Sequence, residues 1–140
     1  MRVVVDASVA AKWILRQRDG EADVDQALAL LRAIQDGSVE VVQPVHWLAE
    51  VAAVSARLAP RFTREAIELL TAAELPIHDD PDVYLRACEL AVDLDAHVFD
   101  TLYHAVALLV AGAELVTADD RYYGKAAALG RIRRLRQLDL

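Results

Sequence analysis

Short valine-rich apolar runs alternate with longer helical patterns along the chain, and this alternation limits the available folds more than any other feature. Candidate strands lie at residues 2–5, 39–43, 74–77, 114–117 and 132–136. The helical patterns between them cover residues 8–16, 21–36, 45–58, 63–73, 81–94, 99–111 and 119–128. Apolar strands joined by helices are typical of a parallel sheet covered on both faces. We therefore expect an α/β fold with a central, mostly parallel sheet flanked by helices.

Prolines and arginines refine this pattern of strands and helices. Pro44 stands where it can open the helix at 45–58. Pro76 lies inside the third candidate strand, so that strand is expected at a sheet edge at most. In the last candidate strand, alternating arginines indicate an edge strand with its charges outward.

Length and composition are those of one globular domain. With 140 residues, 56% hydrophobic content and no low-complexity linker, the chain is expected to form a single domain over residues 1–140.

The single cysteine, Cys88, excludes an intramolecular disulfide and favours a reducing, cytoplasmic setting. Its side chain is expected to be buried. The longest uncharged stretch, at 101–113, is shorter than the ~20 residues that span a bilayer, so we expect no membrane partner. A net charge of −7 argues against nucleic-acid binding by general phosphate attraction, but not against a nuclease with bound metal ions.

Acidic residues stand at positions where a lone charge is unusual. Asp6 and Asp119 come just after apolar strands, and ligands bind beyond the carboxyl ends of strands in open parallel sheets. Glu50 and Asp100 are each the only fully charged residue of an otherwise uncharged helical segment. Together these residues form what we call the acidic quartet.

Each member of the acidic quartet also has an ordinary structural explanation. Asp6, Asp100 and Asp119 are suited to cap the helices that follow them. Glu50, which the pattern places in mid-helix, can extend its side chain to the surface. These explanations are independent of one another, whereas a shared site predicts all the positions at once. We therefore favour a shared site.

A cluster of carboxylates needs protons or cations. Two carboxylates ~5 Å apart repel by roughly 3 kcal/mol at an effective dielectric constant of about 20, whereas a whole domain is stable by only ~5–15 kcal/mol. Oxygen ligands without thiolates or an obligatory histidine select Mg²⁺ or Mn²⁺ over zinc. These ions retain water and contact phosphates, as metal-assisted phosphodiester hydrolysis requires.

Four segments, in order, resemble the motifs of the PIN-domain family. "VVVDASVAAKW" resembles the first motif, a strand that ends on an aspartate followed by a small residue and Ser or Thr. "PVHWLAEVAAV" resembles the second, a proline and then a helix with a glutamate; "VFDTLYHAVAL" resembles the third, an aromatic–aspartate helix start. "ELVTADDRYYGKA" resembles the fourth, a strand followed by Thr–x–Asp. The match covers the whole chain, whose length is that of VapC-type toxins of bacterial and archaeal toxin–antitoxin pairs.

This resemblance implies a site, an activity and partners. The acidic quartet of Asp6, Glu50, Asp100 and Asp119 would hold one or two Mg²⁺ or Mn²⁺ ions. The hydroxyls of Ser8 and Thr117 would support the site. The implied activity is endoribonuclease cleavage of RNA by a metal-activated water. VapC-type proteins usually form homodimers and are held inactive by a VapB-type antitoxin.

Several neighbouring residues are assigned with less support from the pattern. Asp120 stands beside Asp119, and the Thr–x–Asp register favours Asp119 as the ligand. His104 has a spacing from Asp100 that can co-ligate a metal, but a structural histidine is favoured. Tyr103 is assigned to core packing, with a hydrogen bond to an acid or stacking on a base as alternatives. Structural roles are also assigned to His46, His78 and His97, and Trp13, Trp47 and residues 28–31 are candidates for a dimer interface.

Other functions remain open at this point. A PIN-like nuclease can act on DNA flaps or in RNA processing outside any toxin pair. A degenerate PIN scaffold would only bind partners, which the intact quartet disfavours. A phosphoacceptor receiver domain also gathers acids at strand ends, but it requires a lysine after a late strand, and Lys125 lies in a predicted helix.

Overall fold

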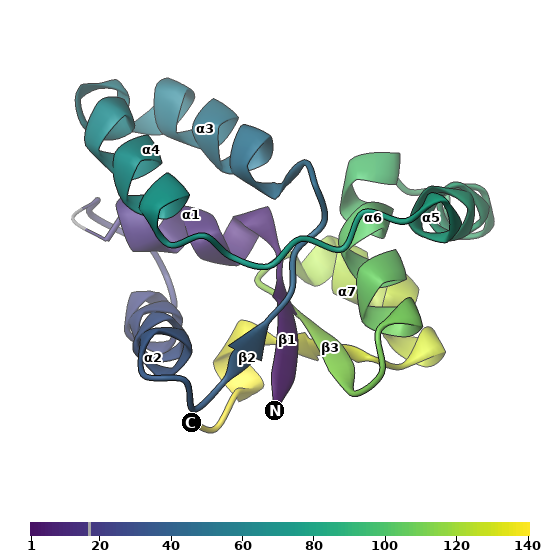
Figure 1. Cartoon of the computed structure of the whole chain (residues 1–140). Coiled ribbons are helices and arrows are strands. Elements are labelled where there is room, and N and C mark those ends of the chain that lie inside the picture. The colour runs from purple at the N-terminus through teal and green to yellow at the C-terminus, as the bar shows by residue number, and fades with distance from the viewer. Residues whose placement is uncertain (17) are drawn as a thin grey trace.

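The computed structural model describes residues 1–16 and 18–140 (Figure 1). Its strands are β1 (Arg2–Val5), β2 (Glu40–Val41), β3 (Ala113–Thr117) and β4 (Ile132–Arg134). Its α-helices are α1 (Ala7–Ile14), α2 (Val24–Gln35), α3 (Trp47–Leu58), α4 (Thr63–Ala72), α5 (Pro81–Leu94), α6 (Val98–Leu109) and α7 (Asp120–Ala126). Single 3₁₀ turns lie at Pro60–Phe62, Ala127–Leu129 and Leu135–Gln137. Within the described ranges, no helix is long and apolar enough to cross a membrane.

The strands form one parallel sheet in the order β2-β1-β3-β4. Strand β1 pairs with β3 from Arg2 opposite Ala113 to Val5 opposite Val116, so the two strands end side by side. Helices α1 to α4 gather on one side of the sheet and α5 to α7 on the other (Figure 1). The valines of β1 are completely buried between these layers. The expected α/β fold with a parallel, helix-flanked sheet is confirmed.

Both tryptophans belong to the core. Trp13 and Trp47 are each only 5% exposed, and Trp13 Nε1 donates a hydrogen bond to Ala27 O at 2.9 Å, which joins α1 to α2. Neither ring therefore offers the exposed surface that a dimer interface was expected to use. Cys88, in contrast, is exposed on α5 although it was expected to be buried.

The strand expected at 74–77 does not form. Only a single parallel bridge joins Gln43 to Ile77. Glu74 has a left-handed φ of 46°, and Pro76 has no N–H to donate, so a regular ladder cannot extend through this segment. The strands expected at 39–43 and 132–136 form, but both are shorter than expected.

Helix α3 begins later than the sequence pattern indicates. Pro44 does not open the helix; its carbonyl instead accepts a turn hydrogen bond from Trp47 N at 3.3 Å, and the helix starts at Trp47. Glu50 consequently lies in the first turn of α3 and not in mid-helix.

Candidate active site

Asp6 joins the carboxyl ends of β1 and β3. Its backbone N–H donates to Val116 O at 3.0 Å. Its carboxylate makes no capping hydrogen bond to helix α1. Instead, Oδ2 accepts hydrogen bonds from Ser8 Oγ at 2.6 Å and from Thr117 Oγ1 at 2.7 Å. The capping explanation of Asp6 is therefore wrong.

The hydroxyls of Ser8 and Thr117 each act twice. Each has one proton, which it donates to Asp6, so the 3.5 Å contact between the two hydroxyl oxygens carries no proton of its own. As acceptors they bind the loop after β3: Ala118 N donates to Ser8 Oγ and Asp119 N donates to Thr117 Oγ1, both at 3.0 Å. Asp6 is thereby held against the loop that carries Asp119. No described residue donates to Asp6 Oδ1, which leaves this oxygen for water or a cation.

Burial dominates the chemistry of the Asp6 carboxyl. The surrounding protein raises its pKa from 3.8 to about 6 by removing water from the charged form, although the residue as a whole is only partly buried. The hydrogen bonds from Ser8 and Thr117 oppose this rise, and the negative charges of Asp100 and Glu50 add to it. A cation beside Asp6 would favour its charged form.

Gln43 is a supporting residue that the sequence analysis missed. It is completely buried, and its side-chain amide bonds both backbone groups of Val5: Val5 N donates to Oε1 at 2.8 Å and Nε2 donates to Val5 O at 2.9 Å. The backbone of Gln43 turns away from β1 at this point and pairs with Pro76 and His78. The amide therefore replaces the missing strand partner immediately before Asp6. A lone glutamine that ends the apolar run "VEVVQ" was the available signal.

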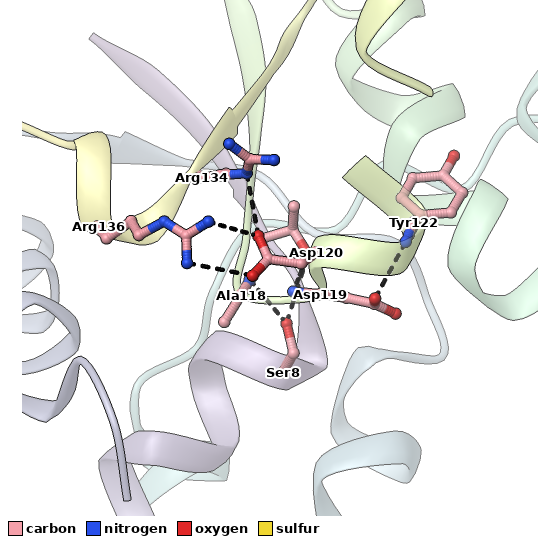
Figure 2. A network of polar contacts seen from close by, with 8 residues as sticks. Ser8, Ala118, Asp119, Asp120, Tyr122, Arg134 and Arg136 are labelled. Atoms are coloured by element: carbon pink, nitrogen blue, oxygen red, sulfur yellow. Dashed lines mark hydrogen bonds and ion pairs between the residues drawn. The ribbon is translucent and has the colours of Figure 1, made fainter. Parts of the chain in front are cut away.

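Adjacent Asp119 and Asp120 have different surroundings (Figure 2). Asp119 caps α7 by accepting from Tyr122 N at 3.0 Å, so its capping explanation is correct. Asp120 points the other way, toward Arg134 at 3.0 Å and Arg136 at 2.9 Å. Because two arginines already neutralise Asp120, Asp119 is the better candidate for a metal ligand.

Asp100 and Glu50 complete the cluster from opposite helices. Asp100 lies in the first turn of α6, whose N-cap is His97, so Asp100 does not cap this helix. Burial raises the pKa of Asp100, the charges of Glu50 and Asp119 raise it further, and His97 and His46 lower it. The quartet is thus linked electrostatically from Asp119 through Asp100 and Glu50 to Asp6.

All members of the quartet share one structural position, the amino end of an α-helix. Asp6 and Asp119 occupy the N-cap positions of α1 and α7, and Glu50 and Asp100 lie in the first turns of α3 and α6. Helix amino ends carry partial positive charge, which favours nearby carboxylates by typically ~0.3–1 kcal/mol each. The convergence of these helix ends makes an acidic cluster tolerable before any cation binds.

Two buried polar atoms beside the quartet lack hydrogen-bond partners among the described residues. They are His46 Nδ1 and Tyr103 Oη. His46 Nε2 donates to Phe99 O at 2.8 Å and lies 3.5 Å from Glu50 Oε2, and the rings of His46 and Tyr103 are 4.7 Å apart. Tyr103 is completely buried; burial and the charge of Glu50 raise its pKa, so its hydroxyl stays protonated. The four-residue spacing of His46 and Glu50 was the signal that could have placed this histidine at the site.

A cavity of about 210 Å³ lies against one side of the quartet. Asp100 and Asp119 line it together with the cationic or titratable side chains of His97, Arg121 and Lys125. Acids and bases thus face the same space. His104, the candidate co-ligand, does not: it is completely buried and bonds Tyr122 Oη at 3.1 Å and Gly130 O at 2.8 Å, which is a structural role.

The quartet fits Mg²⁺ or Mn²⁺ in kind, because every member offers carboxylate oxygens. Among the described residues, no three aspartate, glutamate, histidine or cysteine side chains are close enough to bind the same ion. Mg²⁺, however, usually takes only one or two protein carboxylates and keeps several waters. The quartet therefore fits such an ion in the chemistry of its donors, with water expected to supply the remaining ligands.

Comparison with known proteins assigns the chain to a family. The family model for the PIN domain matches residues 3–128, and this chain therefore belongs to the PIN domain family. The resemblance drawn from the sequence motifs is confirmed at the level of this family. PIN domains are generally nucleases, and those nucleases typically use divalent metal ions.

One solved structure shares the fold over nearly the whole chain. It is a chain of VapBC2 from Rickettsia felis, crystallised bound to a DNA fragment from their promoter. The two chains have a TM-score of 0.65 and 16% sequence identity, and the match covers 96% of this chain and 98% of that chain. A search of curated proteins gives no significant match.

Proposed function

We propose that this protein is a Mg²⁺- or Mn²⁺-dependent endoribonuclease, and that it is the toxin of a VapBC-type toxin–antitoxin pair. The observation that supports this most strongly is the acidic quartet itself. Its carboxylates lie at four helix amino ends and influence one another electrostatically, and none of them has a lysine or arginine ion-pair partner among the described residues. An arrangement that costs stability in the absence of a cation is expected where a cation is bound for function.

The proposed ligands are Asp6, Glu50, Asp100 and Asp119. A bound divalent ion would supply an activated water and would neutralise charge on the phosphate during hydrolysis. The chain itself orients the ligands: Ser8 and Thr117 hold Oδ2 of Asp6, so that Oδ1 would be free to bind the ion. Helix amino ends around the site favour the negative phosphate as well as the carboxylates.

The proposed partners follow from the toxin assignment. The fold shared with a chain of the Rickettsia felis VapBC2 complex supports a VapB-type antitoxin as the partner that holds the enzyme inactive. We further propose a single PIN domain over residues 1–140, a homodimer and a cytoplasmic location. Because the tryptophans are buried, the partly exposed face of α2 at Leu28 and Leu31 is the remaining candidate for the dimer contact.

A cleavage assay with a matched pair of variants tests the proposal. Purified protein is incubated with a structured RNA and with single-stranded DNA, each with Mn²⁺ or with EDTA. We expect cleavage of RNA only with Mn²⁺, loss of cleavage in Asp100→Asn, and unchanged cleavage in Asp82→Asn. Asp82 is the matched control because it is an exposed first-turn acid of α5. Cleavage that survives EDTA, or equal activity of the two variants, would refute the metal site.

A further inference from the structure

Phe99 is an exposed aromatic residue directly beside the acidic quartet. The chain contains only two phenylalanines, and both are about half exposed: Phe99 by 49% and Phe62 by 51%. Phe62 lies in the 3₁₀ turn before α4, whereas Phe99 directly precedes Asp100 in the first turn of α6. The two residues are therefore equally exposed, but only Phe99 is adjacent in the chain to a member of the quartet.

Contacts on both sides hold Phe99 in place. The ring of His97 is 4.9 Å away in a T-shaped arrangement, and the ring of His46 is 5.4 Å away. The backbone is bound by the same histidines, because Phe99 N donates to His97 Nδ1 at 3.1 Å and His46 Nε2 donates to Phe99 O at 2.8 Å. Both histidines also act electrostatically on Asp100. An aromatic face is thus ordered and partly open to solvent at the edge of the quartet.

Cationic side chains lie in a cavity that His97 also lines. His97 lines the 210 Å³ cavity together with Arg121 and Lys125. Arg121 is exposed and forms no ion pair or hydrogen bond with any described residue, whereas Lys125 Nζ donates to Asp95 O. The cavity is also lined by three acids, Asp95, Asp100 and Asp119, and in a chain of net charge −7 an arginine side chain without an ion pair among the described residues is suited to a phosphate.

We propose that these residues form a nucleotide subsite in which an unpaired base of the substrate stacks on Phe99 and its phosphate enters the cavity beside Arg121. The proposal rests on the proposed function and names the residues that position the RNA. Aromatic faces accept bases of single strands and loops, which can unstack, and exclude paired bases of a duplex. The acidic quartet would then act on a phosphodiester next to this nucleotide.

Steady-state cleavage with Mn²⁺ tests the stacking contact. Phe99→Ala is expected to lower kcat/KM for single-stranded RNA by roughly 5- to 150-fold, since base–aromatic stacking is worth about 1–3 kcal/mol. Phe62→Ala is the matched control and should cleave like wild type. Phe99→Trp should retain activity and Phe99→Leu should not, because the aromatic face is needed and apolarity alone is not sufficient. Thermal unfolding verifies that each variant is folded.

Abasic substrates sharpen this test. One nucleotide of the RNA at a time is replaced by an abasic one. At one position the kcat/KM of wild type should fall, whereas that of Phe99→Ala should not fall below its value for the intact RNA. An equal penalty in both proteins at every position would overturn the proposal. Activity of Phe99→Ala equal to wild type would overturn it too while leaving the proposed function intact. A wild type that cleaves no RNA would refute the proposed function, and the subsite with it.

The salt dependence of KM tests the phosphate contact. Loss of one phosphate contact to a single strand lowers the slope of log K against log salt by about 0.7. We expect this change in Arg121→Gln and not in Arg64→Gln, whose arginine lies on α4 and is 91% exposed. An unchanged slope in Arg121→Gln would exclude Arg121 from the subsite.

Discussion

The two ends of the parallel sheet differ in whether their charged side chains are paired. At the amino end, Arg2 pairs with Glu40 at 2.7 Å across β1 and β2 and also donates to Ala111 O at 3.1 Å. At the carboxyl end, the acidic quartet has no lysine or arginine partner among the described residues. A cavity of about 510 Å³, larger than the one beside the quartet, lies at β2 and includes Arg2 and Glu40, so cavity size does not mark the site.

This difference separates charges that serve the surface from charges that serve chemistry. An exposed ion pair such as Arg2–Glu40 contributes about 0–1 kcal/mol and leaves no net charge to act on a ligand. The quartet differs in both respects. Its carboxylates repel one another, which raises the pKa of Asp6 and of Asp100, and hydroxyls and helix amino ends stabilise their charged forms. The following variants test whether the two ends differ in this way.

The largest effect is expected from Asp6→Asn. Asparagine keeps the shape and one oxygen donor but removes a negative charge, so cleavage should fall by more than the ~10–100-fold typical of residues that only orient a ligand. Stability without metal should stay level or rise, because one member of a repelling cluster is gone. Cleavage rates with Mn²⁺ and melting temperatures with and without the ion measure both effects.

Two controls frame that measurement. Asp80→Asn changes the N-cap of α5, where asparagine caps about as well as aspartate, and Glu40→Gln removes the ion pair at the amino end. Both should cleave like wild type, and Glu40→Gln should cost at most about 1 kcal/mol of stability. If Asp6→Asn keeps both its activity and its stabilisation by Mn²⁺, Asp6 has no role at a metal site.

The next effect is a pH dependence of stability in the metal-free protein. The pKa of Asp6 rises from 3.8 in the unfolded chain to about 6 in the folded one, so the folded state binds the proton more tightly. Stability is therefore highest below about pH 4 for this group and declines as the pH rises toward and through about 6, by up to ~3 kcal/mol. Asp100 contributes in the same direction.

Denaturant unfolding at several pH values in EDTA measures this decline. Asp6→Asn should reduce it, because the titrating group is removed. Excess Mg²⁺ should also reduce it, because a bound cation favours the charged carboxylate. A decline of the same size in Asp6→Asn would assign the effect to other groups.

A third effect concerns the Gln43 amide, which lies just after β2 and bonds Val5 immediately before Asp6. Gln43→Leu leaves both Val5 N and Val5 O without their partners in the buried core, which should destabilise the protein by about 1–3 kcal/mol. Gln26→Leu, at an exposed position of α2, is the matched control and should change stability little. Chemical denaturation compares the two, and an equal result would mean that the Gln43 amide does not hold the end of β1.

The periodic parts of the fold were predictable because they depend on local pattern. Valine runs correctly predicted β1 and β3, and lone acids in apolar surroundings are what led us to propose the quartet. The segment 74–77 was misassigned because its composition is apolar, whereas the backbone at Glu74 and the missing N–H of Pro76 prevent a ladder. The start of α3 was also misplaced, because a turn hydrogen bond between Trp47 and Pro44 delays the helix.

The supporting contacts of the site depend on residues that are far apart in the chain. Gln43 reaches Val5 across 38 positions, and Thr117 reaches Asp6 across 111. No local sequence period predicts such pairs, so Gln43 was not singled out, although the acids were named as candidates. Thr117 and Ser8 were named only because their motifs resemble a known family.

The smallest effect on stability is expected from Tyr103→Phe, and Tyr122→Phe, at a second buried tyrosine, is the comparison that tests it. Tyr122 Oη bonds the buried His104 Nδ1 at 3.1 Å, so Tyr122→Phe should cost about 1 kcal/mol. Tyr103 Oη forms no hydrogen bond of normal geometry with a described residue, and its contact with Glu50 is too weak in geometry to count as one, so Tyr103→Phe should cost nothing or stabilise the metal-free protein slightly. A buried hydroxyl that contributes nothing to stability, yet lies among Glu50, Asp6 and Asp100, is expected to donate to water or ligand in the working site. Tyr103→Phe should therefore lower cleavage while the melting temperature stays level, whereas a loss of stability equal to that of Tyr122→Phe would make Tyr103 an ordinary core residue.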